Sequence, residues 1–255
     1  MISRFWIFIW VAFIMAACLP GPLPNQDTTA TAIHTDTPPP TETIVWFPPT
    51  ATHTPFPTPE VTPTVEYLIG VGNVIFHDDF SREDPWQLGK TQISSAAIGL
   101  NELTIVISGT RAYMSSIREQ PVLRDFYLEI TAQPNICRGL DEYGLLLRAS
   151  SSNFYRFALS CDGQVRFDRV IDGVPSVRQP WMLSGSVPPG APSISRLAIA
   201  ASGNEMRFFV NNEFQFSLMD PLLDSGRIGV FARSTSDETV SINFSDLTVW
   251  EILEQ

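Results

Sequence analysis

From residue 73 onward, apolar and polar residues alternate in short runs that turn-forming residues separate. In residues 125–132, Phe126, Leu128 and Ile130 share one face, because alternate residues of a strand point to opposite sides. No long segment has the helical period of about 3.6 residues, so the sequence predicts an all-β domain over 66–255. Strands are expected at 73–80, 96–100, 103–108, 112–119, 125–132, 143–149, 153–161, 164–171, 195–201, 205–211, 213–218, 226–233 and 240–252.

One predicted hairpin has a clear turn signal. Apolar residues alternate from Met206 to Val210, and the following Asn211–Asn212 pair can adopt the positive φ that a tight turn requires. We expect Phe214 and Phe216 to continue the core-facing side of the hairpin after the turn.

The strand at 153–161 permits two registers. In the first register, Tyr155 points outward. In the second, Tyr155, Phe157 and Leu159 share the core face and Arg156 points outward. The strongly apolar character of Phe157 and Leu159 favours the second register.

The first residues have the features of an export signal. The uncharged run 5–17 follows Arg4 and has 13 residues, whereas a bilayer-spanning helix needs about 20. Residues 15–18, Met-Ala-Ala-Cys, resemble the lipobox of bacterial lipoproteins. This resemblance implies cleavage after Ala17, lipidation of Cys18, attachment to the membrane through that lipid, and an exported location at the bacterial cell surface or envelope. The alternatives are an ordinary signal peptide or an uncleaved anchor, with Cys18 incidental.

A proline- and threonine-rich segment follows the cysteine. Residues 19–65 contain 12 of the 21 prolines, 13 threonines and no Lys or Arg. Such a composition buries too little apolar surface to offset the entropy of ordering and predicts an extended, disordered linker. The sequence therefore divides into a lipoprotein signal peptide (1–17), a lipidated cysteine with its linker (18–65) and one folded domain (66–255).

Charge and cysteine content narrow the partners and the covalent structure. The formal charge of −11 argues against nucleic acid as a partner, and no feature indicates an oligomeric state. Cys137 and Cys161 are an even pair in an exported domain, which predicts a disulfide. Two buried free thiols are the alternative.

Several segments of the domain resemble a known family. "HDDFSREDPWQLG", "YGLLLRASSSNFYRFALSCDGQVRF", "SRLAIAASGNEMRFFVNNEFQFS", "GRIGVFARS" and "INFSDLTVWE" are similar to concanavalin A-like lectin and glucanase domains, in the branch of laminin G-like domains and 3-keto-disaccharide hydrolases. The resemblance implies an antiparallel two-sheet jelly-roll sandwich whose first and last strands pair. Members of this group include lectins and glycosidases, so the resemblance indicates the fold more than the activity.

Catalytic and metal-binding patterns are weak. The Glu-x-Asp-x-x-Glu run of retaining glucanases is missing, and His77 is the single histidine of the domain, which disfavours a nucleophile triad or a zinc site. Adjacent acidic pairs near turns, such as Asp141–Glu142, are expected to be solvated loop charges. Asp78 and Asp79, with Asp246 on a neighbouring strand, are weak candidates for a calcium site, and no other cofactor is expected.

Binding is the chemistry that the sequence favours. Planar polar groups can pair with sugar hydroxyls, and aromatic rings can cover their C–H faces. We predict a carbohydrate site on the concave outer face of one sheet, formed by Arg148, Arg156, Arg166 and Asp168 on central strands and by Trp181 in the loop that follows. The alternative is that the arginines are solubilising surface residues and that Trp181 is core.

The expected function is therefore a surface-anchored, non-catalytic module that recognises carbohydrate. A sugar-active hydrolase similar to the 3-keto-disaccharide hydrolases is one alternative. A structural or protein-interaction domain of the cell envelope is the other.

Overall fold

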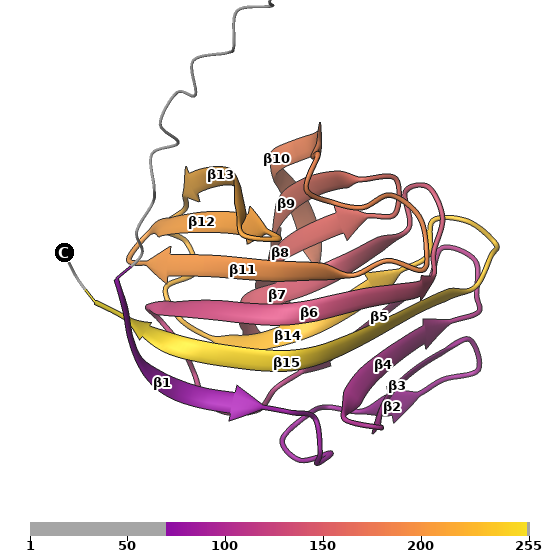
Figure 1. Ribbon diagram of the computed structural model, residues 1–255, viewed down its shortest axis with the longest axis horizontal. Coiled ribbons are helices and arrows are strands. Elements are labelled where there is room, and N and C mark those ends of the chain that lie inside the picture. The colour runs from indigo at the N-terminus through magenta and orange to yellow at the C-terminus, as the bar shows by residue number, and fades with distance from the viewer. Residues whose placement is uncertain (1–69, 254–255) are drawn as a thin grey trace, which may run out of the picture. The chain divides into compact units, whose positions relative to one another are not determined.

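A computed structural model describes residues 70–253 of the chain (Figure 1). The predicted signal peptide, the lipidation at Cys18 and the Pro/Thr-rich linker lie outside the described residues. Within 70–253, we find no helix with the length and apolar character needed to cross a bilayer.

The described residues form strands only, which confirms the all-β prediction. All strand pairs are antiparallel, and the strands make two sheets of nine and six members that pack as a jelly-roll sandwich. The strands are β1 (Val71–Asp78), β2 (Gly89–Lys90), β3 (Ser94–Gly99), β4 (Glu102–Ile107), β5 (Tyr113–Ile117), β6 (Phe126–Ile136), β7 (Glu142–Ser150), β8 (Asn153–Ser160), β9 (Gln164–Ile171), β10 (Val174–Leu183), β11 (Ser195–Ser202), β12 (Glu205–Val210), β13 (Glu213–Met219), β14 (Arg227–Arg233) and β15 (Val240–Ile252).

The nine-stranded sheet lies in front in Figure 1, with β11, β6 and β15 across its middle, and β7, β14 and β5 of the second sheet lie behind it. Its order is β13-β12-β11-β6-β15-β4-β3-β2, and β1 pairs with the second half of β15. The first and last strands are therefore neighbours, as predicted. A register shift between Ser245 and Thr248 divides β15; its first half pairs with β4 and its second half with β1.

The six-stranded sheet has the order β10-β9-β8-β7-β14-β5. Its edge strand β10 corrects the sequence analysis, which predicts a loop at Trp181. Pro175 and Pro180 are compatible with β10 because a proline removes a ladder hydrogen bond, which an edge strand can lose. Two register shifts, between Val177 and Gln179 and between Gln179 and Met182, accommodate the irregular backbone.

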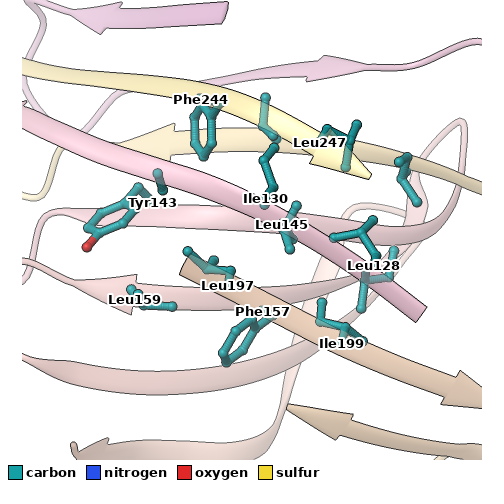
Figure 2. Packing of buried hydrophobic residues seen from close by; sticks show 14 of the residues in the cluster. Leu128, Ile130, Tyr143, Leu145, Phe157, Leu159, Leu197, Ile199, Phe244 and Leu247 are labelled. Atoms are coloured by element: carbon teal, nitrogen blue, oxygen red, sulfur yellow. The ribbon is translucent and has the colours of Figure 1, made fainter. Parts of the chain in front are cut away.

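The core fills the space between the two sheets (Figure 2). Tyr155, Phe157 and Leu159 of β8 are all fully buried there, which confirms the register that places Arg156 on the opposite side. The Phe157 ring lies 4.8 Å from the ring of Phe208 on the opposite sheet, measured between centroids. Aromatic contacts of this kind add to the free energy of burying the two faces.

The β12–β13 hairpin follows the prediction on one strand and departs from it on the other. Asn211 and Asn212 have φ values of 51° and 67°, as the tight turn requires. After the turn, a register shift places Phe216 opposite Phe208 and Phe214 opposite Phe209. Phe214 therefore lies on the outer face and is 37% exposed, so its assignment to the core is wrong.

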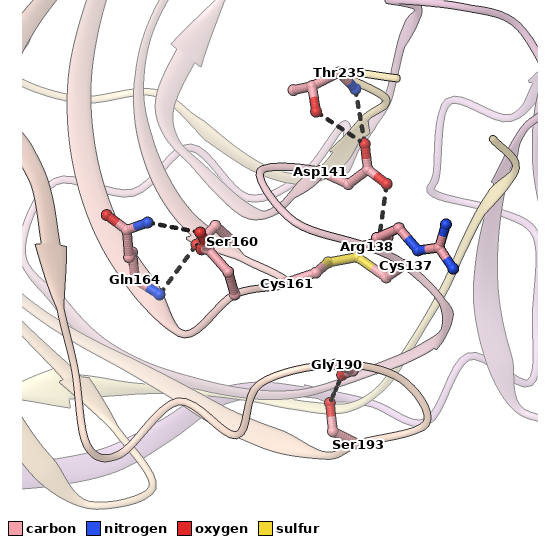
Figure 3. The surroundings of a disulfide bond; sticks show 10 residues. Cys137, Arg138, Asp141, Ser160, Cys161, Gln164, Gly190, Ser193 and Thr235 are labelled. Atoms are coloured by element: carbon pink, nitrogen blue, oxygen red, sulfur yellow. Dashed lines mark hydrogen bonds between the residues drawn. A yellow bond between two sulfur atoms is a disulfide. The ribbon is translucent and has the colours of Figure 1, made fainter. Parts of the chain in front are cut away.

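The predicted disulfide between Cys137 and Cys161 is present (Figure 3). It joins the residue after β6 to the residue after β8, with 5.8 Å between the two Cα atoms. Asp141 lies close by, and its carboxylate accepts hydrogen bonds from the backbone N–H of Arg138 and of Thr235. The disulfide and this carboxylate together fix the turn that leads into β7.

We predict that replacing both cysteines lowers the free energy of unfolding substantially. The bridge spans 24 positions, and closing a loop of that order contributes about 3 kcal/mol in the chain-entropy model. Denaturant unfolding of full-length Cys137→Ser/Cys161→Ser protein against the parent protein measures the difference. In a Cys18→Ser background, thiol labelling of denatured, unreduced protein should find no free thiol. Two labelled thiols would contradict the bridge.

Candidate ligand-binding face

The outer face of the six-stranded sheet brings together four of the five residues predicted to bind sugar. Core residues of β8 and β9 alternate with Arg156, Arg166 and Asp168, which therefore point away from the core. The register places Arg156 opposite Asp168 and Ala158 opposite Arg166. Trp181 of the edge strand β10 completes the group, which we call the arginine face.

The arginine face has an apolar floor. Leu146, Ala158 and Phe231 form a second buried cluster, separate from the main core, and Trp181 packs against it. The Tyr113 ring of β5 stacks on Phe231 with 5.7 Å between centroids. Trp181 is thus partly buried on the outside of the sheet. It does not lie in the core between the two sheets, which was the alternative prediction for this residue.

Asp168 is the centre of the charged part of the face. Its carboxylate is fully buried and accepts hydrogen bonds from Arg156 Nη2 at 2.6 Å and Arg156 Nε at 3.2 Å through Oδ2. Arg166 Nε donates to the other oxygen, Oδ1, at 2.9 Å. Both oxygens of the carboxylate are therefore occupied, as a buried charge requires.

The two guanidinium groups also lie over aromatic rings. Arg156 Cζ is 5.6 Å from the centroid of Phe231, and Arg166 Cζ is 5.6 Å from the centroid of Trp181. The attraction between a cation and the face of a ring holds these long side chains against the sheet. The result is an outer surface that combines planar polar groups with rings, with 21% of the Arg166 side chain exposed.

Sequence reasoning missed two charged residues of the face, Glu142 and Arg233. Glu142 is 3% exposed, so its interpretation as a solvated loop charge is wrong, and so is that of the fully buried Asp141. Arg233 Nη1 donates to Glu142 Oε1 at 3.3 Å, while Glu142 Oε2 is buried without a hydrogen-bond partner among the described residues. Burial raises the pKa of Glu142, although the nearby charges of Arg156 and Arg233 oppose that shift.

Arg148 does not lie on the arginine face. Residues 142, 144 and 146 of β7 point outward, but the backbone at Arg148 has a φ of 48° and lies at a register shift, which turns the side chain inward. Arg148 is 1% exposed and donates hydrogen bonds to the backbone carbonyls of Leu223, Arg124 and Gly203. It connects three loops and has a structural position.

The three calcium candidates do not form a common site. The carboxylate of Asp78 accepts hydrogen bonds from Trp86 Nε1 and Arg118 Nε, both at 3.0 Å. Asp79 accepts one from the backbone N–H of Ser81, and Asp246 pairs with Arg196. In the part of the chain that the structure describes, no group of three or more His, Cys, Asp or Glu side chains could hold a metal ion.

Comparison with known proteins identifies the fold. No protein-family model and no curated protein matches the chain. Among solved structures, a carbohydrate-binding module from Bacillus subtilis, CBM66, is similar with a TM-score of 0.54 and 14% identity, covering 65% of this chain and 95% of that one. A β-glucanase from Bacillus licheniformis has a TM-score of 0.53 and 10% identity, covering 71% of this chain and 98% of that one.

A third similar structure is a protein of unknown function with a galectin-like fold from Bacillus subtilis. Its TM-score is 0.53 and its identity 11%, with 73% of this chain and all (100%) of that chain covered. At these identities the likeness shows the fold alone, and that fold is the concanavalin A-like lectin and glucanase jelly roll.

We predict that Glu142→Gln becomes increasingly stabilising, relative to the parent protein, as the pH rises. The pKa of Glu142 lies above its ordinary value of 4.5 in the folded state, so the native protein binds this proton more tightly than the unfolded chain. The stability that comes from the protonated carboxyl is complete below 4.5 and is lost as the pH rises through the folded-state pKa. Glutamine stays neutral and avoids this loss.

Denaturant unfolding of both proteins at about pH 4, just below the ordinary pKa of a glutamate, and at about pH 8 measures the effect. Glu213→Gln, on the edge strand β13, controls for the change in net charge. A difference between Glu142→Gln and the parent that is constant with pH, or that moves in favour of the parent, would contradict the buried position of Glu142.

Proposed function

We propose that this protein is an exported, lipid-anchored module that binds carbohydrate on the arginine face and does not catalyse a reaction. The observation that carries the proposal is the combination on one outer face of an apolar floor, the partly exposed guanidinium of Arg166 and the partly buried ring of Trp181. Sugars offer hydroxyl groups to planar donors and C–H faces to rings, so such a surface suits them.

The similar structures support the proposal at the level of the fold. One of them is a carbohydrate-binding module and another is a β-glucanase, so this sandwich serves carbohydrate chemistry in other proteins. Fold alone does not determine function, and the argument for this chain therefore depends on its own residues.

A sugar-active hydrolase of the 3-keto-disaccharide hydrolase type is the second candidate. In its favour, Glu142 has a raised pKa and lies on the same face as Asp168, and glycosidases use a carboxyl pair in which one member is protonated. Against it, both oxygens of Asp168 are held by arginines, and Glu142 is almost fully buried. Neither carboxyl is free to contact a sugar, which favours binding. A purely structural or protein-interaction domain is the third candidate.

The anchor is proposed from the sequence. Lipidation of Cys18 and the long Pro/Thr-rich segment would hold the β-sandwich at a distance from the membrane of the cell envelope. A binding module in this position could collect or retain glycans at the cell surface.

We predict that Trp181→Ala weakens glycan binding by about tenfold or more, because truncating an aromatic anchor of a binding site typically costs this much. Since Trp181 packs outside the main core, its removal should cost less than the about 3–5 kcal/mol typical of a core tryptophan. The measurement is calorimetric titration of the full-length protein with the tightest binder from a glycan array, together with thermal melting.

Trp250→Ala is the matched control, because Trp250 is also partly buried and its ring contacts that of Tyr127, 5.6 Å away between centroids, on the outer side of the nine-stranded sheet. Equal affinity of the parent protein and Trp181→Ala, or loss of affinity in Trp250→Ala alone, would count against the arginine face. Absence of binding to every glycan would favour the structural candidate.

We predict that the parent protein partitions with membranes and that Cys18→Ser does not. A serine at this position cannot accept the thioether-linked lipid that the lipobox resemblance implies. Membrane fractionation of cells that express either protein measures the difference. Equal retention of Cys18→Ser would show that residues 5–17 act as an uncleaved apolar anchor instead.

A further inference from the structure

The arginine face has more positively charged side chains than carboxyl groups. Three guanidinium groups, those of Arg156, Arg166 and Arg233, face the two carboxyls of Asp168 and Glu142. Asp168 is shared between two arginines, so one positive charge remains there without a counter-charge. This local excess occurs in a chain whose formal charge is −11, so a positive surface is unusual for it.

The weak pairing of Arg233 adds to the excess. Its hydrogen bond to Glu142 is 3.3 Å long, and 41% of its side chain is exposed. Burial raises the pKa of Glu142 and so favours the neutral form of that carboxyl. The long hydrogen bond and the exposure leave most of the Arg233 guanidinium open to a ligand.

The arginine face also has more unused hydrogen-bond donors than unused acceptors among its charged side chains. The two carboxyls of the ion cluster have little acceptor capacity left, because both oxygens of Asp168 bind arginines and Glu142 Oε2 is buried. The donors are available, because Arg166 uses only Nε for Asp168 and Arg233 uses only Nη1 for Glu142 within residues 70–253. The two terminal nitrogens of Arg166 lie at one end of a planar group beside Trp181.

A surface with many donors and few acceptors suits a ligand group that only accepts. A neutral hydroxyl both donates and accepts, so on this face its proton would find few side-chain acceptors. A carboxylate or sulfate has only acceptor oxygens, and a guanidinium can hold it through two parallel hydrogen bonds.

We propose that the ligand of the arginine face is an acidic glycan, whose carboxylate or sulfate groups are held by the terminal nitrogens of Arg166 and Arg233. This inference depends on the proposed carbohydrate binding and adds the chemical class of the sugar. The apolar floor and Trp181 contact the sugar rings, and the arginines select the charge.

The test compares acidic glycans with neutral partners of the same backbone. Full-length protein in a detergent without a sugar head group is titrated with oligogalacturonate and its methyl ester, and with dextran sulfate and dextran. We expect the acidic member of at least one pair to bind about tenfold or more tightly than its neutral partner, as hydrogen bonds to charged groups imply. The two pairs distinguish carboxylate from sulfate recognition. Higher salt should reduce the preference, because it screens exposed charges.

Two variants locate the effect. Arg166→Gln keeps a planar donor but removes one of the two proposed charges, and it should clearly weaken the preference for the acidic member. Arg207→Gln is the matched control, because Arg207 lies on β12 of the other sheet, beside Glu205. An undiminished preference in Arg166→Gln, or an equal loss in Arg207→Gln, would overturn the assignment.

The remaining outcomes separate this inference from the proposed function. Binding to neutral glycans on an array, with no preference for either acidic probe, would overturn the acidic class and leave carbohydrate binding intact. Failure to bind any glycan, neutral or acidic, would overturn both proposals.

Discussion

The ion cluster of Asp168 with Arg156 and Arg166 determines the chemistry of the outer face. A fully buried carboxylate is costly unless its charge is paired and both oxygens accept hydrogen bonds, and the two arginines on neighbouring positions of β8 and β9 satisfy that requirement. Their guanidinium planes are thereby held over Phe231 and Trp181. The cluster thus places donors and rings side by side on an otherwise apolar sheet surface.

Arginine serves two purposes in this sandwich, and the exposure of its side chain distinguishes the structural arginines from those that can bind a ligand. Arg148 is enclosed by three backbone carbonyls, and burial lowers the pKa of its guanidinium, so it joins loops and has no access to ligand. Asp220 is similarly enclosed, by Tyr155, Arg169 and Arg178. On the arginine face, by contrast, Arg166 and Arg233 keep terminal nitrogens that no described residue uses. Only the second arrangement can recognise a partner.

The alternation of apolar residues was sufficient to predict most of the fold. The predicted strands 164–171 and 240–252 coincide with β9 and β15, and the apolar positions of β8 fix the side on which Arg156 lies. The errors have a common cause in local backbone irregularity. Bulges turned Phe214 outward and Arg148 inward, and an edge position allowed β10 to contain prolines. A bulge changes the face of every later residue, and the side-chain pattern alone does not reveal where it falls.

Only part of the candidate site could be predicted from the sequence, because alternation along a strand does not show which strands pair. The outward positions of Arg156, Arg166 and Asp168 can be predicted from the strict alternation of residues along two strands. Glu142 and Arg233 lie on β7 and β14, and only the pairing of these two strands brings them together. The register of the β7–β8 hairpin places Glu142 opposite Ser160, 18 positions later in the chain. This register can be predicted from the sequence only if the position of the bulge near the hairpin turn is known. Arg233 enters through β14, which is distant in sequence.

Arginine side-chain NMR tests the central claim, that the outer face of the six-stranded sheet is the binding surface. Selective labelling makes the Nε–H resonances of the arginines visible during titration with oligogalacturonate or dextran sulfate. The account predicts that the resonances of Arg156, Arg166 and Arg233 shift with ligand, while those of Arg196 and Arg207 on the nine-stranded sheet stay in place. Shifts confined to Arg196 and Arg207, or binding that leaves all three resonances of the arginine face unmoved, would contradict it.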